Sequence, residues 1–258
     1  MPTLNPEPHQ HREVAESFGT DAGRYDRARP DYPAGLITRI VEAAPGPRLL
    51  DVGTGTGIAA RQFAAAGCTV LGVEPDERMA GLARAGGTEV EVATFEKWEP
   101  RGRVFDAVVA AQAWHWVDPL AGAVTAAEVL RPGSRLTVFW NVFQPPPELA
   151  TILADAFRRF FPEAPAFYDR PALDLYQHMI DNAGQGIIRA DAFHAPEEWR
   201  TAWSRHYTRA EWLDLLPTTG GLTRVPPETR DALLADLATR IGDFTAAYTT
   251  VAVSARRR

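Results

Sequence analysis

The sequence predicts an α/β fold in which helices pack on a mostly parallel sheet. Short apolar runs alternate with helical patterns between residues 34 and 141, as expected when strands and helices alternate along a chain. The first apolar run, residues 49–52, leads into glycines at positions 53, 55 and 57, and the second run, residues 69–73, ends at Glu74. A glycine-rich turn after a buried strand, with an acid at the end of the next strand, is typical of nucleotide-binding, Rossmann-like sheets.

The first half of the chain predicts its elements in order. Residues 1–12 indicate a terminal tail, and the prolines at 30 and 33 form a rigid connector before the first helix. Asp76 is a candidate N-cap, and so is Asp118, which precedes a proline suited to the first helical position. A turn is predicted at 131–133, where proline and glycine adjoin. The predicted strands are 48–52, 69–73, 89–93, 104–110 and 135–141, with helices at 34–44, 57–66 and 119–130.

The prolines at 145–147 separate this core from the second half of the chain. Apolar residues then recur at helical spacing over 147–161, whereas residues 162–198, with Phe167 and Tyr168 among many aromatic side chains, are predicted to be irregular. Because an insertion after the fifth strand lies over the carboxyl edge of such a sheet, we expect it to cover the substrate pocket. An edge strand at 199–207, helices at 209–216 and 227–241, and a last strand at 244–255 complete the prediction. The expected units are a tail and lid (1–33), a cofactor-binding core (34–143), a helical cap (144–198) and a segment that completes the core (199–258).

The glycine turn carries the first functional indication. Glycine is needed where the backbone bends sharply or lets a ligand come into contact, and the following helix offers unpaired N–H groups and a positive dipole end. The turn is therefore suited to an electron-rich ligand group. Ile58 stands where a dinucleotide-binding G-x-G-x-x-G loop requires its third glycine, which weighs against a nicotinamide cofactor. A tight turn without any ligand is the alternative explanation.

Two motifs resemble those of one enzyme family. Asp51-x-Gly53-x-Gly55-x-Gly57 resembles motif I of the class I S-adenosylmethionine-dependent methyltransferases, and Tyr25-x-x-x-Arg29-Pro-x-Tyr32-Pro resembles the N-terminal lid of their small-molecule, methyltransferase-11/25-like branch. The resemblance covers roughly residues 15–141. It implies a seven-stranded, mostly parallel sheet with an antiparallel last strand, an N-terminal lid and a helical insertion after the fifth strand. It also implies methyl transfer from S-adenosyl-L-methionine to an O, N or C atom of a small acceptor, with aromatic compounds and natural products of secondary metabolism among the candidates.

The same resemblance implies a set of cofactor contacts along the carboxyl edge. Glu74 would accept hydrogen bonds from the ribose hydroxyls, with a solvated acid as the alternative, and Arg29 would meet the methionine carboxylate. Met79 would cover the adenine, although a core position is nearly as good an explanation. For Glu96 the resemblance implies a contact with the adenine, and an exposed loop glutamate is the alternative. The full expected set is Tyr25, Arg29, Tyr32, Asp51, Gly53, Thr54, Gly55, Gly57, Glu74, Pro75, Met79, Thr94, Phe95, Glu96, Ala111, Gln112, Ala113 and Trp116.

Two residues are candidates for a catalytic role. Tyr25 would close the methyl channel by the same resemblance. His115 lies in Trp114-His115-Trp116 at the end of the fourth predicted strand, where a neutral imidazole could accept a proton from the acceptor. Packing within an aromatic cluster explains His115 equally well, so the sequence leaves both roles open.

Composition narrows the class of function. The formal net charge is −6, so no broad electrostatic surface for nucleic acid is expected, and we expect a small-molecule substrate. Cys68 is the single cysteine, and no metal-binding pattern is visible, so no metal is expected. No apolar run is long enough to span a membrane and no secretory leader is visible, which predicts a cytoplasmic monomer or homodimer without membrane association. A nicotinamide-dependent oxidoreductase and a non-catalytic cofactor-binding module are the alternatives to a methyltransferase.

Overall fold

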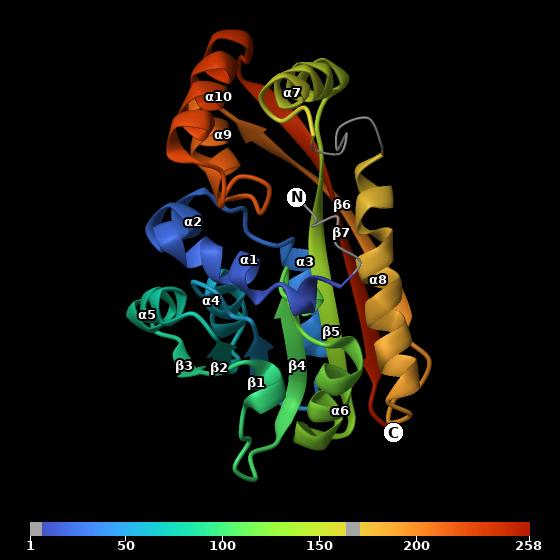
Figure 1. Ribbon diagram of the computed structural model, residues 1–258. Helices are drawn as coiled ribbons and strands as arrows, with labels where there is room; N and C mark the ends of the chain where they lie inside the picture. The colour runs from blue at the N-terminus through green and yellow to red at the C-terminus, as the bar shows by residue number, and fades with distance from the viewer. Residues whose placement is uncertain (1–6, 164–170) are drawn as a thin grey trace.

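A seven-stranded sheet forms the centre of the molecule (Figure 1). The computed structural model describes residues 7–163 and 171–258, so the first six predicted tail residues, Phe167 and Tyr168 lie outside it. The strand order is β3-β2-β1-β4-β5-β7-β6, and β7 runs antiparallel to both β5 and β6. The predicted fold class is thereby confirmed. The strands are β1 (Arg48–Val52), β2 (Thr69–Glu74), β3 (Glu89–Val92), β4 (Phe105–Ala111), β5 (Leu130–Gln144), β6 (Glu197–Tyr207) and β7 (Phe244–Arg256).

Helices cover both faces of the sheet because neighbouring residues of its strands point to opposite sides. Leu49 of β1 belongs to a buried cluster with α3 (Ala34–Glu42) and α4 (Ile58–Ala65). Leu50 belongs to the cluster on the other face, formed with α6 (Pro119–Val129) and α8 (Ala172–Arg189). Sequence runs in which apolar and polar residues do not alternate, such as 104–110, therefore form strands that are buried on both faces.

The predicted helix starts are confirmed at two positions. Asp76 accepts a hydrogen bond from the backbone of Arg78 at the start of α5 (Glu77–Ala85). Asp118 accepts from the first turn of α6, with Pro119 at the first helical position. These side chains satisfy N–H groups that a helix leaves unpaired at its start.

An N-terminal lid crosses the carboxyl edge of the sheet. It consists of α1 (Arg12–Ser17), a 3₁₀ turn (Phe18–Asp21) and α2 (Ala22–Ala28). Arg24 and Arg27 of α2 both bind the carboxylate of Asp214 on α9 (Arg209–Leu215), and on the other side α2 contacts α5. The lid therefore joins the two halves of the molecule.

The long strands carry a second core. β5, β6 and β7 continue past the shorter strands, and α7 (Pro147–Phe160), α9 and α10 (Pro227–Arg240) gather around their upper ends (Figure 1). Leu153, Trp212, Leu233 and Tyr248 are members of this buried cluster. The predicted fifth strand, 135–141, was too short because the Pro132–Gly133 segment interrupts pairing with β4 without ending the strand: Leu130 pairs with Phe105 and Arg135 with Ala107.

The prediction of irregular structure over 162–198 is wrong for most of its length, since α8 runs from Ala172 to Arg189. Its apolar residues, Tyr176, Met179, Ala183 and Ile187, do follow helical spacing and are buried in the main core. Thus α8 packs on the sheet and α6, whereas α7 belongs to the second core. The division of the chain at 144–198 into a separate cap stays a prediction. Across residues 7–163 and 171–258, no helix combines the length and apolarity needed to cross a membrane.

Two glycines of α8 test its packing. A Cβ at Gly186 would lie 2.3 Å from the carbonyl oxygen of Pro119, whereas a Cβ at Gly184 would meet nothing within 4 Å. We expect Gly186→Ala to lower the free energy of unfolding by ~1–3 kcal/mol, because backbone cannot yield to the added carbon. Gly184→Ala, the matched control, should raise it by ~0.5–1 kcal/mol through helix propensity. Urea denaturation measures both, and equal effects would contradict the close approach of α8 to α6.

Candidate cofactor and acceptor site

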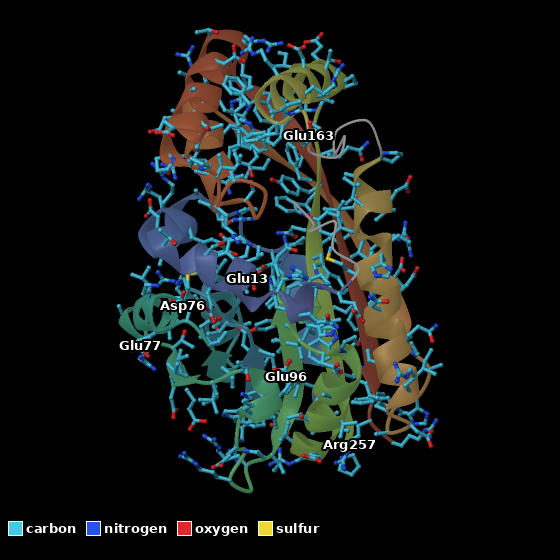
Figure 2. The ribbon with its side chains drawn as sticks, viewed as in Figure 1. Glu13, Asp76, Glu77, Glu96, Glu163 and Arg257 are labelled. Atoms are coloured by element: carbon cyan, nitrogen blue, oxygen red, sulfur yellow. The ribbon has the colours of Figure 1, made fainter. Side chains whose placement is uncertain are left out.

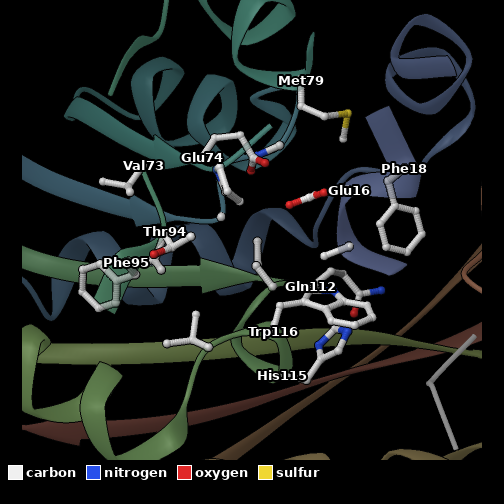
Figure 3. Close-up of a pocket in the computed structure, with 18 of the residues that line it drawn as sticks. Glu16, Phe18, Val73, Glu74, Met79, Thr94, Phe95, Gln112, His115 and Trp116 are labelled. Atoms are coloured by element: carbon white, nitrogen blue, oxygen red, sulfur yellow. The ribbon is translucent and has the colours of Figure 1, made fainter. Parts of the chain in front are cut away.

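A cavity of about 1130 Å³, open solvent at its mouth included, lies at the carboxyl edge of the sheet beneath the lid. Figure 3 shows Thr94 and Phe95 on one side of it and Phe18 on the other, with Met79 above and His115 below. The structure thus brings together most of the residues predicted from the sequence. They are Tyr25, Arg29, Gly53, Gly55, Glu74, Pro75, Met79, Thr94, Phe95, Glu96, Ala111, Gln112, Ala113, Trp116 and, among the catalytic candidates, His115.

The glycine turn has the conformation that its residues require. Gly53, Gly55 and Gly57 have φ values of +65°, +57° and +87°, which L side chains rarely adopt. A Cβ at Gly53 would lie 2.5 Å from the Cβ of Ala113, so the turn leaves no room for a side chain there. A Cβ at Gly55 would meet only the methyl group of Met79, at 3.6 Å. At Gly55 the wall of the cavity is therefore bare main chain.

Four predicted contacts lie outside the wall of this cavity. Gly57 packs against α5, where a Cβ would lie 3.2 Å from that of Ala83. The hydroxyl of Thr54 donates to Oδ2 of Asp51 at 2.7 Å, and both side chains are buried. Tyr32 lines a second cavity instead. Gly57, Thr54 and Asp51 thus shape the turn from within the protein, a distinction that the sequence motif alone does not show.

Glu74 joins the turn to the end of β2. Its Oε2 accepts from the backbone N–H of Gly55 at 2.9 Å, and its Oε1 accepts from that of Asp76 at 3.0 Å. Burial raises the pKa of Glu74 to about 7, and burial likewise raises the pKa of Asp51 to about 7. A carboxylate offers about four acceptor positions, so Glu74, which lines the cavity, retains capacity for two further hydrogen bonds.

Contacts at Asp76 hold the lid in place over this site. Figure 2 shows Asp76 on the side of α5 that faces the lid. The guanidinium of Arg78 pairs with Asp76 at 2.6 Å and donates to the carbonyl of Glu16 at 2.7 Å. Gly19 lies so close that a Cβ would be 2.0 Å from Asp76 Oδ2. The lid residues Glu16 and Phe18 consequently line the cavity.

The sequence prediction missed several residues of this wall. Ala15, Glu16 and Phe18 precede the lid motif on which the prediction depended, and Tyr176 and Met179 lie on α8, which was not predicted. For α8, the apolar spacing was a usable signal. For Ala15, Glu16 and Phe18, we identify no signal in the sequence that places them at the cavity.

A second cavity of about 1210 Å³, open solvent included, adjoins the first. It lies between the lid, α8 and the second core, and aromatic and aliphatic side chains dominate its wall. Tyr25, Arg29, Gln112 and Tyr176 line both cavities. Gln112 directly follows β4 with a φ of +57°, an uncommon conformation for a residue with a side chain, and its backbone N–H donates to the carbonyl of Phe139. The two cavities therefore meet at the carboxyl end of β4.

His115 is held in a defined orientation. The indole N–H of Trp140, a fully buried residue of β5, lies 3.2 Å from His115 Nδ1. Since an indole N–H only donates, Nδ1 must accept, and the neutral ring then carries its proton on Nε2. Burial also lowers the pKa of His115 to about 3. At neutral pH this geometry favours an imidazole that donates from Nε2 over one that takes up a proton.

Within the described part of the chain, no group of three or more His, Cys, Asp or Glu side chains is arranged to hold a metal ion. A mostly parallel sheet covered by helices on both faces, a bare glycine turn and an acid at the end of β2 are together typical of Rossmann-like cofactor-binding proteins.

Comparison with known proteins identifies the family. A family model described as a methyltransferase domain matches residues 25–176, and the chain belongs to this family. The class I S-adenosylmethionine-dependent methyltransferase prediction is confirmed, and S-adenosylmethionine is the cofactor. The site fits that cofactor: Gly55 leaves main chain bare, and Glu74 keeps free acceptor positions beside it.

Individual relatives agree with this family. An uncharacterized methyltransferase of Mycobacterium tuberculosis is 40% identical over 132 residues, which cover 50% of this chain and 54% of that protein. The chain thus spans about half the length of the first curated relatives it matches. An uncharacterized methyltransferase-like protein of Schizosaccharomyces pombe is 23% identical over 86% of this chain and 84% of its own. A putative type II methyltransferase of Anaeromyxobacter dehalogenans has the same fold, with a TM-score of 0.59, 21% identity and coverage of 88% of this chain and 97% of that one.

The state of His115 is measurable by nitrogen NMR. Between pH 6 and pH 8 we expect Nδ1 to resonate as an unprotonated nitrogen and Nε2 as a protonated one, without titration, because Trp140 donates to Nδ1 and burial lowers the pKa. The spectrum of His115→Gln assigns the signals. In Trp140→Phe, which lacks the donor, the preference for the Nε2–H form should weaken. A protonated Nδ1 in the wild-type protein, or titration near the usual histidine pKa, would contradict the orientation.

Proposed function

We propose that this chain transfers a methyl group from S-adenosylmethionine to a small-molecule acceptor that binds in the second cavity. The observation that carries the proposal is the meeting of the two cavities at Tyr25, Arg29, Gln112 and Tyr176. One cavity would hold the methyl donor and the other the acceptor. The acceptor atom is O, N or C, and the aromatic walls favour a flat, apolar acceptor.

The proposed contacts follow from the cavity wall. Glu74 accepts the ribose hydroxyls, and Arg29 pairs with the methionine carboxylate, since its Nε is buried without a partner among the described residues. Met79 and Phe95 flank the adenine, with Thr94 and Glu96 at its edge. Asp51, Thr54, Gly57 and Tyr32 act indirectly, by supporting the turn and the lid.

The chemistry required of the protein is mainly positioning. When bound, S-adenosylmethionine supplies an electrophilic methyl group attached to a sulfonium. The residues at the junction hold the acceptor's lone pair in line with that group, and such alignment contributes up to ~7–11 kcal/mol to the lowering of a barrier. Tyr25 of the lid closes the junction against water. This chemistry needs no covalent intermediate on the protein.

For His115 we propose a hydrogen-bond donor rather than a base. Its Nε2–H would orient an acceptor oxygen or a cofactor atom while Trp140 holds the ring. An acceptor that is already unprotonated at neutral pH needs no base, which agrees with this role. The location in the cell and the oligomeric state stay predictions from the sequence.

The alternatives make different predictions. A nicotinamide-dependent oxidoreductase would bind NAD(H), and Ile58 and the methyltransferase family both weigh against it. A non-catalytic module would bind the cofactor without ever transferring the methyl group to any acceptor.

Replacement of Glu74 tests the proposal. Calorimetry with S-adenosylhomocysteine should give a dissociation constant at least tenfold higher for Glu74→Gln, because a neutral amide accepts more weakly and turns an N–H₂ group toward a backbone N–H. Glu77→Gln, an exposed neighbour paired with Arg84, is the matched control and should bind as the wild type does. Turnover is then measured as the transfer of a labelled methyl group from S-adenosylmethionine to a mixture of candidate acceptors.

The pH dependence of this binding has a defined sign. With a raised pKa of about 7, Glu74 is protonated below that pH and ionised above it. Affinity for S-adenosylhomocysteine should therefore fall as the pH is lowered from 8 to 6, and should fall less in Glu74→Gln. Equal affinities of the wild-type protein and Glu74→Gln at pH 8 would contradict the proposed role of Glu74.

A further inference from the structure

The walls of the two cavities differ in charge. The first cavity carries three carboxylates, Glu16, Glu74 and Glu96, which suits a cofactor bearing an ammonium and a sulfonium. Among the described residues that line the second cavity there is no aspartate or glutamate, and Arg29 is the one ionic group. Among the described residues, the acidic groups of the two walls thus lie on the cofactor side of the junction.

Arg29 has no acidic partner in the part of the chain that the structure describes. Its guanidinium donates to the carbonyl of Thr218 and lies 4.8 Å from the centre of the Tyr25 ring. Among the described residues, no carboxylate forms an ion pair with it, and its Nε is buried without a hydrogen bond. The described wall of the second cavity therefore holds no carboxylate that could pair with a cation.

Three aromatic side chains of this wall already pack against other rings of the protein. Phe143 and Trp212 stack on each other with centroids 4.6 Å apart, and Tyr248 stacks on Trp203 at 4.3 Å. One face of each of these rings is therefore already covered. The hydroxyl of Tyr248 is also engaged, at 2.7 Å from that of Tyr207. A cage for a cation needs several free ring faces directed at one point, and these three rings each have one face covered.

Resting on the proposed function, we propose that the second cavity binds flat, apolar acceptors that are uncharged or anionic, and that it excludes protonated amines. Burial of an ammonium without a carboxylate partner is unfavourable, and the nearby sulfonium of the cofactor adds repulsion. Uncharged hydroxyl compounds meet neither obstacle, and a carboxylate is attracted by both Arg29 and the sulfonium. The charge of the wall thus defines the class of acceptor.

Three probes with the same ring system test this inference on the full-length protein saturated with S-adenosylhomocysteine, whose uncharged sulfur leaves the wall of the cavity alone to discriminate between them. They are 2-naphthol, 2-naphthoate and 2-naphthylmethylammonium, titrated at pH 7 by calorimetry. We expect the first two to bind and the ammonium compound to bind at least tenfold more weakly than either.

A single isosteric substitution should alter this preference. Gln144, the last residue of β5, is exposed and lines the second cavity. Gln144→Glu introduces a carboxylate without a change of shape, so it should strengthen binding of the ammonium probe at least fivefold and weaken that of naphthoate. Gln185→Glu, the same change on an exposed position of α8 outside both cavities, should leave all three affinities unchanged.

The outcomes separate this inference from the proposed function. Failure of S-adenosylhomocysteine to bind contradicts the proposed function, and the inference with it. If S-adenosylhomocysteine binds but the ammonium probe binds as tightly as naphthoate, or none of the three probes binds, only the acceptor class is wrong. A Gln144→Glu variant that fails to fold leaves the ranking of the probes on the wild-type protein to decide.

Discussion

The carboxylate of Glu74, held between two backbone N–H groups, is the interaction on which the rest of the site depends. One N–H belongs to Gly55 in the turn after β1 and the other to Asp76 in the turn after β2. The carboxylate thereby fixes two loops from neighbouring strands at the same edge of the sheet. Asp76 in turn starts α5 and pairs with Arg78, and Arg78 holds the lid through the carbonyl of Glu16. A few residues therefore connect the turns after β1 and β2 with the lid that covers the cavity.

The acceptor side depends on a different feature, the length of the last strands. β5 and β7 pair from Arg135 with Arg256 through to Gln144 with Ala247, so this ladder continues past the end of β4. The helices packed around this extension close a second core, and Trp212, Leu215 and Tyr248 from it line the second cavity. The nucleotide-binding half and the acceptor half are thus built on one continuous sheet.

Much of this could be predicted from the sequence where the signal is local. The glycines, the buried strands and the capping aspartates each depend on a few neighbouring residues, and the structure agrees with them. The α8 helix was missed because the aromatic residues scattered over 162–198 and the two glycines of the helix itself obscured a regular apolar spacing. The true length of β5 was missed because Pro132 and Gly133 indicate a turn, whereas the strand resumes beyond them.

Other features needed three dimensions. Gly53, Gly55 and Gly57 look equivalent in the sequence, yet Gly53 and Gly55 line the cavity whereas Gly57 packs on α5. His115 could be a base or a packed ring until Trp140, twenty-five positions along the chain, was found to occupy its Nδ1. The absence of acids from the described wall of the second cavity depends on residues drawn from distant segments.

A crystal structure of the protein with S-adenosylhomocysteine tests the central claim most directly. We expect both ribose hydroxyls to lie within hydrogen-bond distance of the Glu74 carboxylate and the amino-acid portion to rest along the main chain at Gly53 and Gly55. A complex in which the ribose contacts other groups, or in which the adenosyl moiety occupies the second cavity, would contradict it.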